Sequence, residues 1–303
     1  MSTAAWTIAH RRIEEEVIPG MRLGRNIRRD SRDAAYPYRG DPQRTLADQL
    51  WARHLEIFDQ DGYGSCTGEA EEGLLATDPF FAALPAGVLL SQAGALKLYS
   101  EAEIIDGGAG LPSEDDGSSG QSASQAAKND GLISGYTHAA DVNEMAAALQ
   151  DGPVIVGVSW YSSFDSPASS GLIAISKGAY VRGGHEFLVR GVKVSEKLFL
   201  ADNSWGSGWG LKGSMELTWD TMARLFGEEG DCTVSVPLTA PAPVPVPVPP
   251  VPADPDSLLW SGGPSQRLPG GLKAWAAEHR VREDLRDLQA DARAWAQAHG
   301  YAL

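Results

Sequence analysis

The chain is short of cysteine, with two residues of this type, Cys66 and Cys232, among 303. If one of them must stay a free thiol, no disulfide can form, which is typical of a reducing compartment. Long apolar runs are also absent, and the first residues lack a sustained apolar stretch after a basic start. We therefore expect neither a signal peptide nor a transmembrane segment, and we predict a cytoplasmic protein.

Basic side chains are scarce relative to acidic ones. There are 25 Lys and Arg against 40 Asp and Glu, which gives a formal net charge of −15. This balance argues against nucleic acid or an anionic membrane as a partner. Solubility is a sufficient reason for the negative charge, and a preference for cationic substrates stays open.

The common motifs of metal and cofactor sites are missing. No paired Cys and His spacing suggests zinc, and there is neither a G-x-S-x-G serine elbow nor a P-loop. Glycines 208, 210 and 213 satisfy a dinucleotide fingerprint, but strand-like residues follow them where a helix is needed. Asp59 and Asp61 begin like a calcium loop, yet Tyr63 and Ala70 occupy positions that need oxygen ligands. We expect no metal and no cofactor.

Composition and proline content suggest the domain organisation. The 43% hydrophobic and 21% charged content is that of an ordinary globular protein. We predict a lead-in over residues 1–21, a main domain over 22–238, a proline-rich linker over 239–256 and a C-terminal segment over 257–303. Residues 241–255 hold eight of the 19 prolines, so the linker should be a stiff polyproline II spacer of about 45 Å at roughly 3.1 Å per residue.

An apolar stripe at helical spacing predicts a helix over residues 272–299, beyond the linker. A lone amphipathic helix must bury that stripe against its own domain, a second copy of the chain or another protein. The sequence does not choose among these three, and self-association or a protein partner through this helix remains a hypothesis.

The predicted elements of the main region are helices first and strands second, which indicates an α+β fold. Residues 28–38 are expected to be extended, and the Gly- and Ser-rich residues 107–120 to form a loop. Helices are predicted over 7–17, 67–76, 88–105 and 122–129, the last closed by Gly131. Strands are predicted over 154–160, 187–194, 198–201 and 214–218.

Three short fragments carry the groups that thiol chemistry needs: residues 60–66, 183–185 and 202–206. A thiol is a strong nucleophile only as the thiolate, which a nearby imidazolium stabilises. Cys66 and His185 are the candidate pair, and Asn203 can fix the tautomer and ring plane of the imidazole. Gln60 is the candidate donor to a developing oxyanion, together with the backbone amide of Cys66.

The predicted helix over 67–76 places the thiol of Cys66 at a helix N-terminus, where the macrodipole favours negative charge. We therefore expect the pKa of this thiol to be depressed. His185 is distinguished from the other five histidines by the two glycines before it, which let backbone and substrate approach closely.

With these motifs the chain resembles the papain family of cysteine peptidases over roughly residues 22–237. The glutamine six residues before the cysteine, the Gly-Ser-Cys turn and the Asn-Ser-Trp-Gly-x-x-Trp-Gly run over 203–210 carry the resemblance. Tyr63 and Thr67 stand where papain has cysteine and tryptophan, which is similar to the disulfide-poor bacterial and bacteriophage branch. The resemblance implies a helical lobe with the cysteine and an antiparallel sheet or barrel lobe with the histidine and asparagine, with the active site in a cleft between them.

The resemblance also implies roles for further residues. Trp205 would shield the His–Asn hydrogen bond from water. Gly64 and Ser65 would line the cleft, and Gly117 and Ser118 would offer backbone groups to an extended peptide. The sequence names no specificity pocket. No long inhibitory propeptide is visible, so control of activity is expected to come from elsewhere.

Two carboxylates depart from the usual pattern of the family. Glu186 follows the histidine where a small apolar residue is usual, and Asp202 precedes the asparagine. Each could tune the imidazolium or simply face solvent.

The sequence thus predicts a cysteine endopeptidase that hydrolyses peptide bonds of proteins through a thioester acyl-enzyme. Two alternatives stay open: a hydrolase of cell-wall peptides, and a structural or interaction protein on a retired peptidase fold. If the protein is encoded by a phage, it would be virion-associated or released on lysis.

Overall fold

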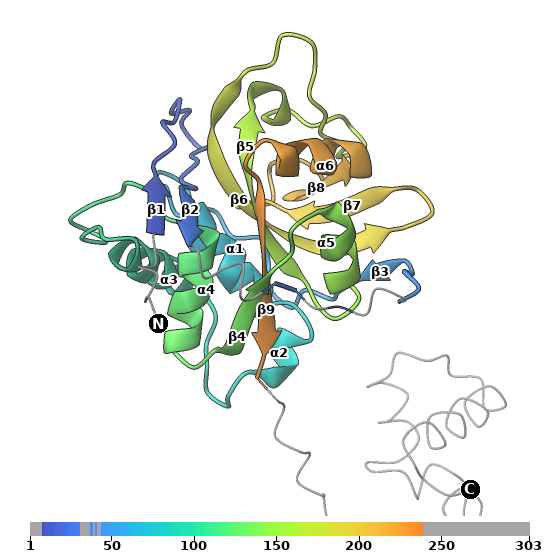
Figure 1. Ribbon diagram of the computed structural model, residues 1–303. Coiled ribbons are helices and arrows are strands. Elements are labelled where there is room, and N and C mark those ends of the chain that lie inside the picture. Colours follow the sequence, from blue (N-terminus) through green and yellow to red (C-terminus); the bar gives the residue numbers. More distant parts are fainter. Residues whose placement is uncertain (1–7, 31–36, 39, 41–43, 239–303) are drawn as a thin grey trace, which may run out of the picture. The chain divides into compact units, whose positions relative to one another are not determined.

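An antiparallel sheet of seven strands dominates the C-terminal part of the computed structural model, which describes residues 8–30, 37–38, 40 and 44–238 (Figure 1). The strand order is β4-β9-β5-β6-β7-β8, and β3 also pairs with β6. The strands are β3 (Gln49–Leu50), β4 (Ile133–His138), β5 (Val154–Tyr161), β6 (Val181–Lys193), β7 (Leu198–Asp202), β8 (Ser214–Thr218) and β9 (Asp231–Pro237).

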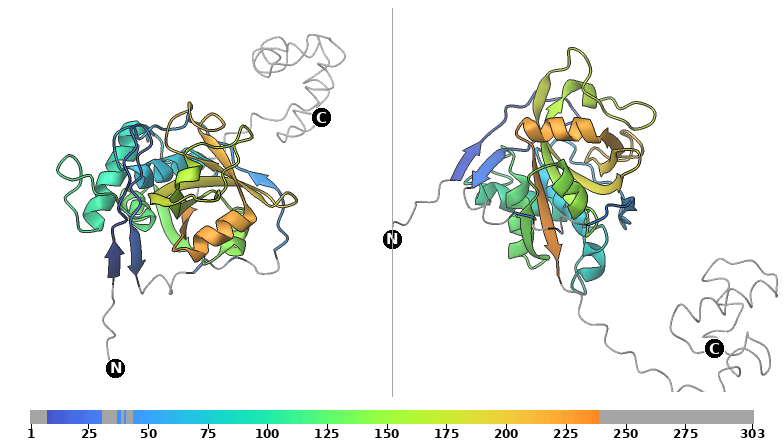
Figure 2. Two further views of the ribbon diagram at one scale, coloured as in Figure 1. Left: turned by 90° about the horizontal axis from the view of Figure 1, so that it is seen from above. Right: turned by 45° about the vertical axis from the view of Figure 1, so that its right-hand side comes forward.

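The helices of the described residues are α1 (Cys66–Leu75), α2 (Phe80–Ala83), α3 (Gln92–Ile105), α4 (Gly120–Asn129), α5 (Val142–Ala148) and α6 (Trp219–Gly227). Helices α1 to α4 precede most of the sheet in the chain, whereas α5 and α6 lie between its later strands. A short 3-10 turn, Ser162–Phe164, follows β5. Figure 2 shows the blue-green helices on one side and the yellow and orange elements on the other, which is the expected α+β arrangement of two lobes.

Local capping explains why two of the helices begin where they do. The Ser91 side chain accepts a hydrogen bond from the Gly94 amide at the start of α3, and Ser119 does the same for Ser122 at the start of α4. Each satisfies a backbone donor that the first turn leaves unpaired. Gly131, with φ of +72°, follows the end of α4 as predicted, since this backbone region favours glycine.

Two apolar cores correspond to the two lobes. The helical core packs α1, α3 and α4 through residues such as Leu74, Leu98 and Ala126. The sheet core contains Trp160, which is fully buried and packs edge-on against Phe164 and Trp205. Ile155 and Leu188 of the sheet belong to the helical core, so this core joins the two lobes along α1.

The N-terminal region is a β-hairpin, and the helix predicted over residues 7–17 is wrong for its described part. Strand β1 (Ile8–Arg11) pairs antiparallel with β2 (Ile27–Asp30), so that Arg11 faces Ile27. Beyond β1 the chain is not helical; the Glu16 amide donates to the carbonyl of Arg182 at 2.7 Å. Pairing with distant segments therefore overrides the helical pattern.

The other predicted helices and strands are confirmed, with shifted ends. The helix predicted over 88–105 begins at Gln92, because Ser91 caps it. Strand β6 begins at Val181, six residues earlier than predicted, since its two glycines look like a loop in the sequence. Helices α2, α5 and α6 and strands β4 and β9 were not predicted. The proline-rich linker and the helix predicted over 272–299 lie outside the described residues.

Helix α1 buries three carboxyl groups, which is unusual for a helix of ten residues. Glu69, Glu71 and Glu72 are each at most 3% exposed. Burial raises the pKa of Glu69 to about 8 and those of Glu71 and Glu72 to about 7. Each has hydrogen-bond donors, for example the Ser124 hydroxyl at 2.8 Å from Glu71. At neutral pH the carboxyl groups of α1 therefore retain part of their protons.

These carboxyl groups predict that the protein is more stable near pH 5 than near pH 8. Their folded-state pKa values lie above the ordinary value, so the folded state holds protons that the unfolded chain releases as the pH rises from about 4.5 to about 8. His185 acts oppositely below about pH 6.5, but it is one group against several. The expected loss of stability is at least about 1 kcal/mol, measured by urea unfolding at both pH values.

Glu71→Gln should flatten this pH dependence, because the amide keeps the contacts to the Ser124 and Ser235 hydroxyls and does not titrate. Glu196→Gln, at an exposed position, is the matched control and should leave it unchanged. A stability that rises from pH 5 to pH 8 in the unaltered protein would contradict the prediction.

Candidate active site

Cys66 is the first residue of α1 and is completely buried. The preceding turn over residues 60–65 brings the chain into the helix, and the first-turn amides of α1 lie at the helix end that carries Cys66. The helix predicted from the sequence is thus present, with the thiol at its N-terminus.

His185 lies in β6, where it faces Val158 of β5 across the ladder. Its Nε2 is 2.6 Å from Oδ1 of Asn203, which directly follows β7. The amide oxygen is an acceptor, so this contact assigns the ring proton to Nε2. The other ring nitrogen, Nδ1, is buried and makes no hydrogen bond. The pair therefore leaves Nδ1 as the atom that can exchange a proton.

Two tryptophans enclose the imidazole. The Trp205 ring lies 5.1 Å from the His185 ring at an interplanar angle of 35°, and the Trp160 ring lies 4.7 Å away at 71°. Trp205 is 5% exposed. The indoles thus cover the imidazole and keep water from competing for its contact with Asn203.

Gln60 links the turn before Cys66 to the segment that holds Asn203. Its Nε2 donates to the Tyr63 carbonyl at 2.8 Å, and its Oε1 accepts from the Ser204 hydroxyl at 2.6 Å. Its backbone amide donates to the Ser204 carbonyl at 2.9 Å. These contacts use one of the two protons on Nε2, and Gln60 is 1% exposed.

The residue after His185, Glu186, links the Cys66 sulfur to the strand that carries the imidazole. The backbone N–H of Glu186 faces the Cys66 sulfur and favours its ionised form. Because residues 185 and 186 are adjacent in β6, the start of α1 meets the strand that carries the histidine. The structure therefore brings together Gln60, Cys66, His185 and Asn203, which lie far apart in the sequence.

Burial shifts both ionisable partners toward their neutral forms. It raises the pKa of the Cys66 thiol well above its ordinary value and lowers the pKa of His185 to about 3. The expectation of a depressed thiol pKa is therefore wrong for this arrangement, because loss of solvent outweighs the favourable Glu186 amide. Burial in this arrangement therefore favours the neutral thiol and the neutral imidazole.

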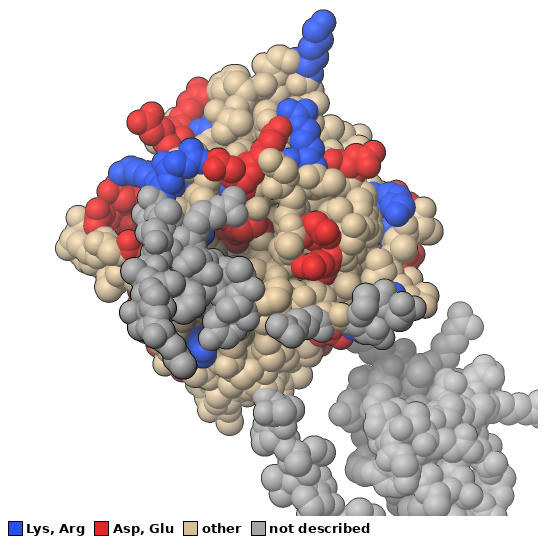
Figure 3. Space-filling model, in the orientation of Figure 1, with Lys and Arg blue, Asp and Glu red and all other residues tan. Residues whose placement is uncertain are grey.

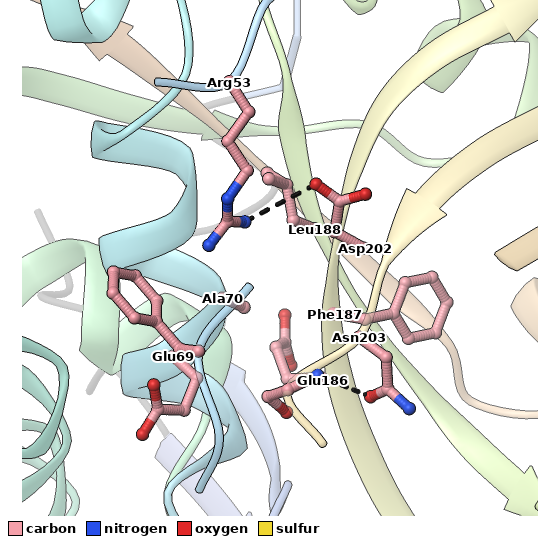
Figure 4. A pocket seen from close by; sticks show the side chains of 10 residues that line it. Arg53, Glu69, Ala70, Glu186, Phe187, Leu188, Asp202 and Asn203 are labelled. Carbon is pink, nitrogen blue, oxygen red and sulfur yellow. Dashed lines mark hydrogen bonds and ion pairs between the residues drawn. The ribbon is translucent and has the colours of Figure 1, made fainter. Parts of the chain in front are cut away.

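The two unusual carboxylates do not face solvent. Asp202 is 2% exposed and accepts hydrogen bonds from Arg190 at 2.8 Å and from the Ser214 hydroxyl at 2.7 Å, with Arg53 at 3.5 Å. Figure 4 shows Arg53 reaching across to Asp202, with Glu69 of α1 on the helical side. Glu186 is completely buried, and both of its carboxyl oxygens lack a hydrogen-bond partner.

The residues predicted to line the cleft lie around this site. The Gly64 amide donates to Asp115 at 2.9 Å, and the Ser65 hydroxyl donates to Glu69 at 3.1 Å. Gly117 has a φ of +81°, and the Ser118 amide donates to the carbonyl of Gly24 at 2.9 Å. Arg25 and Asp231, which pair with each other nearby, were not predicted; no sequence signal links residues so far apart.

The described residues show neither a metal-binding cluster nor a membrane-spanning helix. The described part of the chain contains no group of three or more His, Cys, Asp or Glu side chains placed to hold a metal ion. No helix in that part is long and apolar enough to cross a membrane.

Comparison with known proteins adds independent information. Residues 93–236 match the family model described as papain family cysteine protease. That match includes His185 and Asn203 and begins after α1. A search of curated proteins finds no match.

Solved cysteine proteases share the fold. Xylellain, a cysteine protease from Xylella fastidiosa, is 18% identical with a TM-score of 0.57, covering 73% of this chain and 97% of its own. Amb a 11, a ragweed pollen cysteine protease in its proform, is 18% identical with a TM-score of 0.51, covering 69% and 72%. Digestive procathepsin L 3 of Tenebrio molitor larval midgut is 21% identical with a TM-score of 0.50, covering 66% and 73%. The family-model match over residues 93–236 and the shared fold together support a papain-like cysteine peptidase.

Proposed function

We propose that Cys66, His185 and Asn203 form the catalytic triad of an endopeptidase that hydrolyses peptide bonds of proteins. The observation that carries the proposal is the 2.6 Å contact between His185 Nε2 and Asn203 Oδ1, which leaves Nδ1 free. An imidazole held through Nε2 has one nitrogen available for the thiol, which is the arrangement that nucleophilic catalysis by cysteine needs.

The reaction follows from these roles. Nδ1 of His185 takes the proton of Cys66, and the sulfur attacks the peptide carbonyl carbon. The carbon–nitrogen bond breaks as His185 returns the proton to the leaving amine, which leaves a thioester on Cys66. His185 then takes a proton from water, the hydroxide attacks the thioester, and the proton returns to the sulfur as the acid product leaves.

Gln60 is proposed as the side-chain donor to the tetrahedral oxyanion, together with the backbone amide of Cys66. One proton of its amide nitrogen binds the Tyr63 carbonyl, and the second is available to a substrate oxygen. The Ser204 hydroxyl fixes the amide orientation through Oε1 at 2.6 Å. Donors fixed before the reaction stabilise the oxyanion without reorganising.

A protein or peptide is the proposed partner, and a nucleic acid is not. On the face in Figure 3, where the described residues are coloured, basic and acidic side chains are intermingled. That face presents no extended basic surface among those residues, and the net charge of −15 opposes binding to a phosphate backbone.

Cys66→Ala should abolish hydrolysis of casein, a loss of at least about 10³-fold, because the nucleophile is removed. Cys232→Ala is the matched control: this second buried cysteine lies on β9, and its loss should preserve activity. Both variants are assayed on casein and on purified peptidoglycan. Activity of the unaltered protein on peptidoglycan alone would favour a cell-wall hydrolase, and activity that survives Cys66→Ala would refute the triad.

Asn203→Ala should lower kcat about 10²-fold with little change in KM, because the imidazole loses the acceptor that sets its tautomer and orientation. Steady-state kinetics on a fluorogenic peptide measure this change. Asn129→Ala, at the exposed last residue of α4, is the control and should keep the kcat of the unaltered protein. An unchanged kcat in Asn203→Ala would show that another group orients His185.

Gln60→Glu should lower kcat by about 10²-fold or more, as expected when one oxyanion donor is lost. The carboxylate keeps the size of the side chain and can still accept from Ser204, but it cannot donate. Comparing kcat and KM of this variant with those of Gln60→Ala separates donation from packing. If Gln60→Glu keeps full activity, the donor role is refuted.

A further inference from the structure

Asp202 is the last residue of β7, directly before Asn203, and its carboxylate is buried. Three donors hold the carboxylate: Arg190 Nε at 2.8 Å, the Ser214 hydroxyl at 2.7 Å and Arg53 Nη1 at 3.5 Å. The next backbone amide, that of Asn203, donates to the carbonyl of Gly213 at 2.9 Å. Any displacement of Asp202 is therefore passed to the residue whose side chain contacts His185.

Arg53 belongs to the segment that leads to Gln60. Its Nε donates to the carbonyl of Leu55 at 3.0 Å, and its Nη2 donates to the carbonyl of Glu56 at 3.1 Å. The side chain is 8% exposed, and its remaining nitrogen, Nη1, is the one directed to Asp202. One guanidinium thus holds the chain before Gln60 in shape and joins it to the end of β7.

The surroundings of Arg53 fix the direction of its side chain. A Cβ at Gly73 of α1 would lie 2.8 Å from Nη1, so a glycine there lets the guanidinium run against the helix. The guanidinium also lies over the Phe58 ring, 5.1 Å from its centre. Figure 4 shows the side chain reaching Asp202 beside α1.

Arg190 brings a third segment to the same carboxylate. It lies on β6, the strand that carries His185. Besides its contact with Asp202, its Nη1 donates to the carbonyl of Trp51 at 3.1 Å, and the Trp51 amide donates to the carbonyl of Arg190 at 2.9 Å. Trp51 stands just before Arg53, so the two arginines are also tied to each other through the backbone.

The Asp202 carboxylate therefore joins the segment that leads to Gln60, the strand of His185 and the strand that ends before Asn203. Buried ion pairs are weak sources of stability, because apolar side chains of the same volume often stabilise a fold equally well. Charged hydrogen bonds are directional, however, and fix the geometry of a site more narrowly than apolar packing does.

We propose that Asp202, held by the two arginines, is a positioning residue that sets the place of Asn203 relative to Gln60. Through Asn203 it fixes the plane of the His185 ring. The proposal rests on the proposed function of these three residues. Asp202 acts only through its neighbour, and the effect on the rate is large because a displacement of about 1 Å can slow a reaction about 10²-fold.

Asp202→Asn in the full chain tests the proposal. The amide keeps the size of the side chain but loses the charge that the arginines bind. With a fluorogenic peptide, kcat should fall about tenfold with little change in KM. In Asn203→Ala the same substitution should lower kcat less than about twofold, because the residue through which Asp202 acts is already lost. Urea unfolding verifies that each assayed variant is folded.

Glu216→Gln is the matched control. Glu216 lies on β8 of the same sheet and pairs with Lys193 at 2.9 Å. Its substitution also removes one negative charge and one ion pair, but neither residue contacts the candidate site. The kcat should stay unchanged both in the unaltered chain and in Asn203→Ala.

If Asp202→Asn does not fold, Arg53→Lys makes a second test. Lysine keeps the charge, but its single nitrogen cannot replace the fork that reaches Leu55, Glu56 and Asp202. The kcat should fall about tenfold in the unaltered chain and less than about twofold in Gln60→Glu.

The cycle separates the positioning role from the triad. Equal losses of kcat with and without the second substitution, or no loss in either case, overturn the positioning role and leave the triad standing. An unchanged kcat in Asn203→Ala overturns the triad and, with it, the positioning role.

Discussion

The contact between the N-terminus of α1 and strand β6 is the constraint on which the site depends. There the Cys66 sulfur faces the backbone amide of the residue after His185, so two segments more than a hundred residues apart meet at the proposed reaction centre. Helix α1 also buries the carboxyl groups of Glu69 and Glu71, and burial raises their pKa values to about 8 and about 7. All ten residues of α1 are buried, including carboxyl groups that would otherwise be ionised in water.

Much of this arrangement could be predicted from local signals. Helices α3 and α4 begin at capping serines and β5 is rich in β-branched residues, so their types follow from short windows of sequence. The hairpin of β1 and β2 could not be predicted, because each strand has four residues and its partner lies beyond a long connection. The residues placed at the site were found because each stands in a short motif.

Charged side chains account for most of what the sequence did not reveal. Arg25, Glu186 and Asp231 meet only in the folded chain, and a sequence gives no reason to place three such groups together. A charge in a sequence is normally expected to be exposed, because burial without a partner is costly. This cluster departs from that rule beside the proposed catalytic residues, where departures from local consistency are expected.

Residues 12–26 and the two lobes that they bridge belong to one chain. Hydrogen bonds between separate molecules are lost when the solution becomes dilute, whereas a tethered segment experiences a local concentration in the millimolar range or above. The backbone contacts of Gly24 with Gly184 and with Ser118 are therefore independent of how much protein a cell contains.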